Sequence, residues 1–141
     1  MIIGQIRDGI VLDHITAGNG IRIYDILGLG KLDCTVAMIK NADSSKMGKK
    51  DIIKVGQVID LDFAVLGYID PGITVNIIRD GKLLKREHLS LPERVTGIIK
   101  CKNPRCITVA EPQLDAIFLL SDEEKRTYRC AYCDTEKQRK L

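Results

Sequence analysis

Four cysteines in the last third of the chain form two close pairs, with the pattern C-x4-C followed by C-x2-C. The four residues are Cys101, Cys106, Cys130 and Cys133. A tetrahedral zinc ion is bound by four soft donors at about 2.3 Å, and two short loops with paired thiolates supply such a set. Because four thiolates close the coordination shell, no position remains for water or substrate. The spacing therefore predicts one structural Zn2+ that stabilises a small domain and carries out no chemistry itself.

Paired cysteines also occur as disulfides and as redox-active C-x2-C motifs. The N-terminal sequence MIIGQIRDG has no basic segment, no long apolar run and no small-residue cleavage site, so we expect a cytoplasmic location with reduced thiols. The fifth cysteine, Cys34, lies far upstream and is expected to be a small buried apolar residue. A redox motif is typical of a single pair on a βαβ background, whereas this chain has two pairs. Both alternatives remain open beside zinc.

Asp13 and His14 form a second group of interest, because they interrupt the apolar strand signal of residues 9–15. Two adjacent polar groups in a strand carry a desolvation cost unless they are exposed or paired. A solvated edge strand explains them without any ligand, since polar groups in proteins usually find local partners. Taken alone, the two residues do not establish a binding site.

A basic stretch lies further along the chain and contains Lys46, Lys49, Lys50 and Lys54. Lys50 and Lys54 suit a triphosphate, because each ammonium is a compact charge with three donors. From charge alone, a solvated basic loop is the simpler interpretation. The chain has no Walker-type loop and no Gly-x-Gly-x-x-Gly motif, and its two histidines form no legible catalytic arrangement. We therefore expect a protein that is not an enzyme.

The composition is that of a globular protein, with 141 residues, 45% hydrophobic and 29% charged. The apolar runs are too short to cross a bilayer, so we expect no membrane association. The net charge is +3, and a zinc–thiolate cluster carries a net negative charge that offsets the basic C-terminal region. With no Trp and only two Phe, the chain has few rings for stacking on bases. A zinc ribbon that binds nucleic acid or protein remains the alternative function.

A domain boundary is expected at the segment SLPER, where Pro92 ends the preceding strand signal. It divides the chain into a first domain of residues 1–92 and a zinc-binding domain of residues 93–141. The first domain shows strand signals at 9–15, 35–40 and 50–58, a polar loop at 41–50, a helix capped by Asn19 and a helix from Asp60 to Leu66.

The clearest local signal is the Asp80-Gly81 pair between two apolar runs, which favours a hairpin with a type I′ turn. A two-residue loop places Asn76 opposite Lys85 and Ile78 opposite Leu83. The order of elements predicts an α+β fold in which an antiparallel sheet carries two helices on one face, as in a ferredoxin-like sandwich. A small all-β zinc-binding domain follows it.

Several separate motifs together resemble one family, the regulatory chain of aspartate carbamoyltransferase. They are Gly9-x-Val11-Leu12-Asp13-His14-Ile15, Met47-Gly48-Lys49-Lys50-Asp51-Ile52-Ile53-Lys54, Thr74-Val75-Asn76, Ser90-Leu91-Pro92-Glu93-Arg94 and the cysteine pattern. The resemblance covers nearly the whole chain. It implies a non-catalytic subunit of pyrimidine biosynthesis that binds the effectors CTP and ATP, forms a regulatory homodimer and contacts a catalytic chain through its zinc domain.

The resemblance also implies a set of nucleotide-binding residues. The base and ribose would contact Ile6, Val11, Asp13, Asn76, Ile78 and Leu83, and the phosphates would contact His14, Lys50, Lys54 and either Lys85 or Arg86. Arg86 stands where the family has a phosphate-binding lysine, and Gly81 replaces an aromatic residue near the turn. Because adjacent strand residues face opposite ways, Asp13 and His14 cannot both point into one pocket from a regular strand. We therefore expect a bend or a strand edge there, or one contact made through the backbone.

Overall fold

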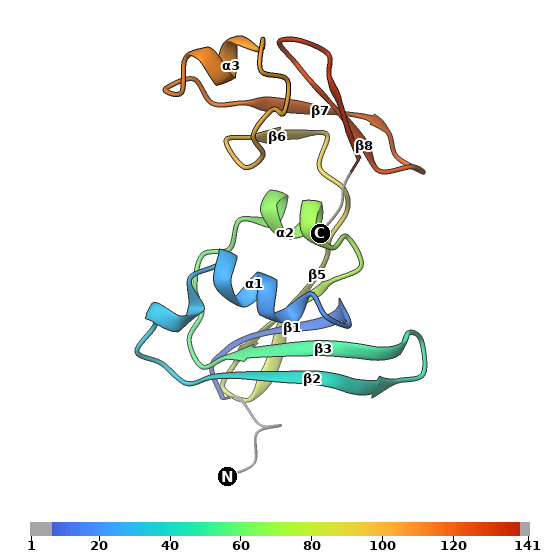
Figure 1. The fold of residues 1–141 in the computed structure, drawn as a ribbon. Coiled ribbons are helices and arrows are strands. Elements are labelled where there is room, and N and C mark those ends of the chain that lie inside the picture. Colours follow the sequence, from blue (N-terminus) through green and yellow to red (C-terminus); the bar gives the residue numbers. More distant parts are fainter. Residues whose placement is uncertain (1–6, 139–141) are drawn as a thin grey trace.

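The computed structural model describes residues 7–138, which form two antiparallel sheets (Figure 1). The first sheet has the strand order β2-β3-β1-β4-β5. Its elements are β1 (Gly9–Thr16), α1 (Gly20–Ile26), η1 (Leu29–Lys31), β2 (Val36–Ser44), β3 (Gly48–Val55), α2 (Phe63–Ile69), β4 (Thr74–Arg79) and β5 (Lys82–His88). The chain order βαββαβ with β1 between β3 and β4 is that of a ferredoxin-like sandwich, to which β5 adds an edge strand.

The second sheet is smaller and follows a short linker. Its order is β6-β7-β8-β9. The elements are β6 (Arg94–Thr96), α3 (Ile107–Ala110), β7 (Ile117–Asp122), β8 (Thr127–Cys130) and β9 (Glu136–Gln138). An α+β unit followed by a small sheet domain with clustered cysteines confirms the predicted fold class. No helix in residues 7–138 is long and apolar enough to cross a membrane.

Alternation along the strands divides the first sheet into a covered face and an open face. Leu12 of β1, Ile53 of β3 and Val75 of β4 are buried and pack with Ile23 of α1 and Leu66 of α2. Residues between these positions point to the other side of the sheet. Both helices lie on one side of the sheet, and α2 lies between it and β6 (Figure 1). The face opposite the helices is therefore the one available to a ligand.

The N-cap residue of α1 is the predicted one, whereas that of α2 is not. Asn19 occupies the N-cap position of α1 but makes no side-chain capping bond. Instead, the buried carboxylate of Asp51 accepts bonds of 3.0 Å from the backbone N–H groups of Gly18 and Gly20. The prediction that Asp60 caps the second helix was wrong, because the Asp62 carboxylate accepts the N–H groups at the start of α2. The sequence offered two aspartates two residues apart, and only tertiary packing selects between them.

The predicted polar loop at 41–50 was also wrong, since most of it belongs to strands. β2 continues to Ser44 and β3 begins at Gly48. The register shifts between Ile39 and Ala42, and Asn41 takes a positive φ of 57°. Its backbone N–H donates to Asp51 Oδ1 at 3.0 Å. After this irregularity, the polar end of β2 continues to pair with β3.

The hairpin β4–β5 has the predicted turn and a different register. Asp80 and Gly81 have positive φ of 52° and 74°, as a type I′ turn requires. Ile78 pairs with Leu83, as predicted. The register then shifts by one residue, so that Asn76 pairs with Arg86 and Ile77 with Lys85. The prediction that Asn76 faces Lys85 was wrong, because a β-bulge exchanges the faces of the two basic residues.

The linker is packed between the two sheets. The rings of Tyr68 in α2 and Tyr128 in β8 meet edge to face with centroids 5.2 Å apart. Tyr128 Oη donates to the carbonyl oxygen of Pro92 at 2.7 Å. A Cβ atom at Gly67 would overlap the carbonyl oxygen of Ser90, so only glycine allows α2 to approach the linker this closely. Both units therefore contact the linker directly.

Candidate metal centre and ligand-binding face

The four predicted cysteine ligands gather at one point in the second unit. The Sγ atoms of Cys101 and Cys133 are 3.6 Å apart, and those of Cys106 and Cys130 are 3.7 Å apart. All four sulfur atoms lie within 4.8 Å of one another. Four sulfurs bound tetrahedrally at about 2.3 Å from zinc are about 3.8 Å apart, whereas a disulfide needs about 2.05 Å. The spacing of the sulfur atoms thus fits a metal shell, and all five cysteines of the chain are free thiols.

Two tight turns bring the sulfur atoms together. In the first, Cys106 N–H donates to the carbonyl oxygen of Asn103 at 3.0 Å. In the second, Asp134 has a positive φ of 64°, and its N–H donates to the carbonyl oxygen of Cys130 at 2.8 Å. Arg129 of β8 donates to the carbonyl oxygen of Asp134 at 3.2 Å. Hydrogen bonds thus hold the backbone of each turn.

The surroundings of the four cysteines raise the pKa of two thiols and lower the pKa of the other two. Burial raises the pKa of Cys101 to about 12 and also raises the pKa of Cys130. The Thr135 hydroxyl lowers the pKa of Cys133 to about 6, and the Thr108 hydroxyl lowers that of Cys106. Without a cation the cluster would hold both thiols and thiolates near neutral pH. A divalent metal that prefers sulfur would supply the positive charge that keeps all four deprotonated.

A row of predicted ligand-binding residues crosses the first sheet. Lys54 pairs with Val11, Val11 with Asn76, and Asn76 with Arg86. Cross-strand partners share a face. Since the flanking residues Leu12 and Val75 are in the core, this row lies on the face opposite the helices. The structure thus brings together residues from four strands that the sequence separates widely.

Hydrogen bonds fix the orientation of the Asn76 amide, which is 9% exposed. Its Nδ2 donates to the carbonyl oxygen of Val11 at 3.3 Å, and its Oδ1 accepts from Arg86 Nε at 2.8 Å. Lys85 points to the other face beside Ile77, where its Nζ lies 2.6 Å from Glu87 Oε1. Of the two basic candidates on β5, only Arg86 reaches the open face.

Asp13 and Lys50 form an ion pair at one end of this face. Lys50 Nζ lies 2.9 Å from Asp13 Oδ1, which also accepts the backbone N–H of His14 at 2.6 Å. Burial of Asp13 acts to raise its pKa, but the hydrogen bonds from Lys50 and from the His14 N–H outweigh burial and hold the pKa below its usual range. The carboxylate is therefore charged at neutral pH.

The strand bends at His14, as predicted. His14 has a positive φ of 59°, and the register of β1 against β3 shifts between Leu12 and Ile15. Its Nδ1 lies 3.2 Å from Thr74 Oγ1. The sequence analysis assigned no role to Thr74, although it lies two residues from Asn76 and therefore on the same face. That alternation was the signal available for finding it.

The remaining candidates lie at the margin of this face. Ile78 and Leu83 pair at the end of the hairpin, where Leu83 is 52% exposed. Ile6 lies outside the described residues. Sequence reasoning also missed Thr108 and Thr135, whose hydroxyls contact cysteine sulfurs. Both follow the second cysteine of a pair by two residues, and this repeated Cys-x-Thr spacing is visible in the sequence.

Comparison with known proteins identifies both units. Residues 1–90 match the family model of the aspartate carbamoyltransferase regulatory chain, allosteric domain, and residues 93–140 match the metal binding domain of the same chain. Among curated proteins, the chain is 53% identical over 134 residues to the aspartate carbamoyltransferase regulatory chain of Clostridium acetobutylicum, covering 95% of this chain and 92% of that protein.

Two further regulatory chains extend this comparison. That of Clostridium tetani is 52% identical over 135 residues, with 95% of this chain and 94% of the relative covered. That of Bifidobacterium longum is 40% identical over 136 residues, with 96% and 98% covered. The match to a metal binding domain favours the metal interpretation of the cysteines over disulfides or a redox pair. The chain therefore belongs to the family of aspartate carbamoyltransferase regulatory chains.

Proposed function

We propose that this regulatory chain binds CTP and ATP on the open face of its five-stranded sheet. The observation that supports this is the convergence of hydrogen-bonding and cationic side chains from four strands on that face. Val11, Ile78, Leu83 and Ile6 would contact the base and ribose, and Asp13 and Asn76 would accept or donate hydrogen bonds. The phosphates would bind His14, Lys50, Lys54 and Arg86.

In the ion pair between Asp13 and Lys50, a bound phosphate group would take the place of the Asp13 carboxylate as the partner of Lys50. A phosphate group that binds Lys50 replaces one anionic partner by another, so the ammonium never loses its counter-charge. The Asp13 carboxylate is then available to accept hydrogen bonds from ribose hydroxyls. A triphosphate carries more charge than a carboxylate, and this favours the exchange.

We assign the metal as one structural Zn2+ held by Cys101, Cys106, Cys130 and Cys133, because four clustered thiols suit a soft divalent ion. When bound, the ion supplies a closed tetrahedral link between the two turns. Its function is to hold the surface around α3 in shape. No step of catalysis is assigned to it, since its coordination shell leaves no position for a substrate.

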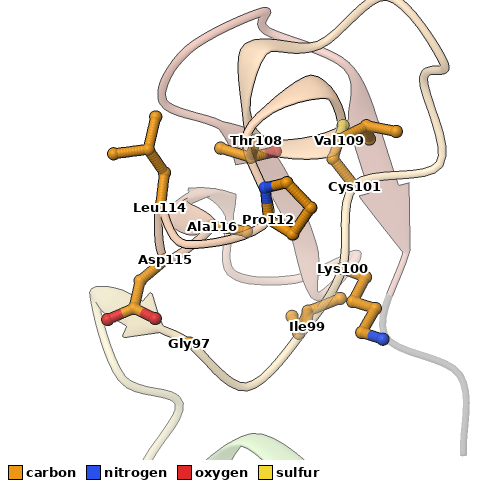
Figure 2. A pocket seen from close by; sticks show the side chains of 10 residues that line it. All are labelled: Gly97, Ile99, Lys100, Cys101, Thr108, Val109, Pro112, Leu114, Asp115 and Ala116. Atoms are coloured by element: carbon orange, nitrogen blue, oxygen red, sulfur yellow. The ribbon is translucent and has the colours of Figure 1, made fainter.

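Beside the metal ligands the second unit has a hollow of about 410 Å³ (Figure 2). Its lining includes the apolar residues Ile99, Val109, Pro112, Leu114 and Ala116. Of its lining residues, Val109 and Leu114 are 43% and 39% exposed. An apolar hollow rimmed by exposed aliphatic side chains suits an apolar side chain of a protein partner. We place the contact with the catalytic chain here.

The homodimer is assigned to the free edge of β2. Within residues 7–138, β2 pairs with β3 alone. The opposite edge, β5, has the sequence KLLKREH, whose charges discourage pairing. The first residues of β2, Val36–Ile39, are apolar. Antiparallel pairing of two β2 strands would join two sheets into one. Light scattering should report a dimer for the isolated chain and a monomer for Ile39→Lys.

Regulation follows if CTP and ATP bind the two quaternary states of the complete enzyme with different affinities. The test is to purify the chain with its catalytic partner and to titrate activity with each nucleotide. Lys54→Ala should weaken the nucleotide response by roughly tenfold while the complex still assembles. Lys49→Ala is the matched control, because Lys49 lies on the same strand and pairs with Asp43 at the exposed turn. Equal nucleotide responses of the two variants would contradict the proposed site.

A further inference from the structure

Each turn of the metal centre carries a threonine hydroxyl against a sulfur atom. Thr108 Oγ1 lies 3.1 Å from Cys106 Sγ, and Thr135 Oγ1 lies 3.1 Å from Cys133 Sγ. In both turns the threonine follows the second cysteine of the pair by two residues. The sulfur pair Cys101–Cys133, 3.6 Å apart, and the pair Cys106–Cys130, 3.7 Å apart, each contain one such cysteine. The arrangement repeats although the two turns differ in length.

We propose that Thr108 and Thr135 are positioning residues of the metal centre, each donating a hydrogen bond to a coordinated sulfur and so slowing release of the ion. This rests on the proposed function, in which the four cysteines hold Zn2+. A sulfur bound to zinc retains lone pairs that can accept a hydrogen bond. Four thiolates around one Zn2+ leave net negative charge on the sulfurs, and a hydroxyl donor stabilises that charge.

The surroundings of Thr108 support a specific bond rather than a chance contact. The residue is 9% exposed and lies in α3, at the wall of the hollow beside Cys101 (Figure 2). A buried hydroxyl costs free energy unless it has a partner. Thr127 of β8 provides the contrast, since its buried Oγ1 has no hydrogen-bond partner within residues 7–138. Of these two buried threonines, Thr108 has a cysteine sulfur as its side-chain partner and Thr127 has none among the described residues.

Thr127 therefore serves as the control position for replacing threonine by valine at positions 108 and 135. Thr→Val removes a hydroxyl and keeps the shape of the side chain. Full-length chains carrying Thr108→Val, Thr135→Val, both, or Thr127→Val would be purified with zinc and mixed with excess 4-(2-pyridylazo)resorcinol, whose absorbance reports transferred zinc. Each single change at 108 or 135 should speed release by roughly tenfold, the double change by more, and Thr127→Val should behave as the wild type.

Two further measurements separate hydrogen bonding from a general loss of packing. Thr108→Ser and Thr135→Ser keep the hydroxyl and should restore slow release. In the cobalt-substituted chain, loss of a hydrogen bond to sulfur raises the energy of its lone pairs, so the sulfur-to-cobalt charge-transfer bands should move to longer wavelength in the valine variants only. A structural role alone would leave the bands in place.

The zinc content and the rate of zinc release together test both the metal centre and the role of the two hydroxyls. If the purified wild type contains one zinc per chain and the valine variants release it no faster than Thr127→Val, the hydroxyls have no such role and the zinc centre itself stands. If elemental analysis finds no zinc in the wild type, the proposed metal centre fails, and the role of the hydroxyls fails with it. Slow release by the serine variants and fast release by the valine variants supports the proposal.

Discussion

Arg86 Nε donates a hydrogen bond of 2.8 Å to Asn76 Oδ1 across strands β4 and β5. The bond uses the inner nitrogen of the guanidinium, and the two terminal nitrogens are those that bind phosphate oxygens as a fork. Asn76 is held in turn by the carbonyl oxygen of Val11. Val11 of the central strand β1 thus orients Asn76 of β4, and Asn76 in turn orients Arg86 on the edge strand β5.

Removal of this basic group should weaken effector binding selectively. Arg86→Ala should lower the affinity for CTP by about 10- to 100-fold, since hydrogen bonds to charged groups contribute about 1.5–3 kcal/mol. Lys85→Ala should bind CTP as the wild type does, because Lys85 faces the other side of the hairpin. Isothermal titration of both variants decides between the two residues. Weaker binding by Lys85→Ala alone would show that the register changes when the ligand binds.

The ion pair of Asp13 and Lys50 should make stability depend on pH. The pKa of Asp13 is lower in the folded chain than in the unfolded one, so its contribution is present above the unfolded pKa of about 4 and is lost as pH falls through the folded pKa. Asp13→Asn should therefore lower the free energy of unfolding at neutral pH and have a smaller effect in acid. Urea unfolding of both chains across this range measures the difference.

A matched variant tests whether that pH dependence belongs to the half-buried pair. Asp43 pairs with Lys49 at 2.6 Å, but its side chain is 94% exposed. Solvent screening makes such a pair contribute little. Asp43→Asn should therefore leave the free energy of unfolding nearly unchanged at every pH. An effect as large as that of Asp13→Asn would argue against a special role for Asp13.

Loss of one metal ligand should unfold the second unit. Cys101→Ser leaves three thiolates for the ion, and a unit of this size has too small a core to compensate. We expect loss of bound zinc and of assembly with the catalytic chain, measured by elemental analysis and co-purification. Cys34→Ser is the control, because Cys34 packs against the first core, away from the metal. Normal assembly of Cys101→Ser would refute the structural role of zinc.

The linker contact of Tyr128 should contribute measurably to stability. Tyr128→Phe removes the donor to Pro92 and keeps the ring against Tyr68. The loss should be about 1 kcal/mol, rising toward 3 kcal/mol if the carbonyl stays buried without a partner. Tyr132→Phe, at a residue 48% exposed, should have little effect. Chemical unfolding of the two variants provides the comparison.

Features set by short-range chemistry could be predicted from the sequence. The cysteine spacing requires two turns, and both turns form around one point. The Asp80-Gly81 pair requires positive φ at both residues, and both have it. The bend at His14 was one of the alternatives expected once the resemblance had assigned both Asp13 and His14 to one pocket. Each of these depends on a few adjacent residues.

Features set by distant contacts could not be predicted in this way. The bulge that brings Arg86 opposite Asn76 leaves no mark in the sequence KLLKRE, since residues 82–86 are all exposed and burial does not select a register. The buried Asp51 binds the start of α1 from a strand that lies thirty residues later in the chain, and helix-capping rules consider only neighbours.

The close approach of Gly67 to Ser90 makes this contact between α2 and the linker one of backbone atoms. The distance between them is limited there by main-chain radii. A larger residue at position 67 would push the linker away from α2, and the metal-binding sheet that follows the linker would change its orientation relative to the first sheet. A single methyl group would thus alter how the two units face one another while leaving every cysteine of the metal centre unchanged.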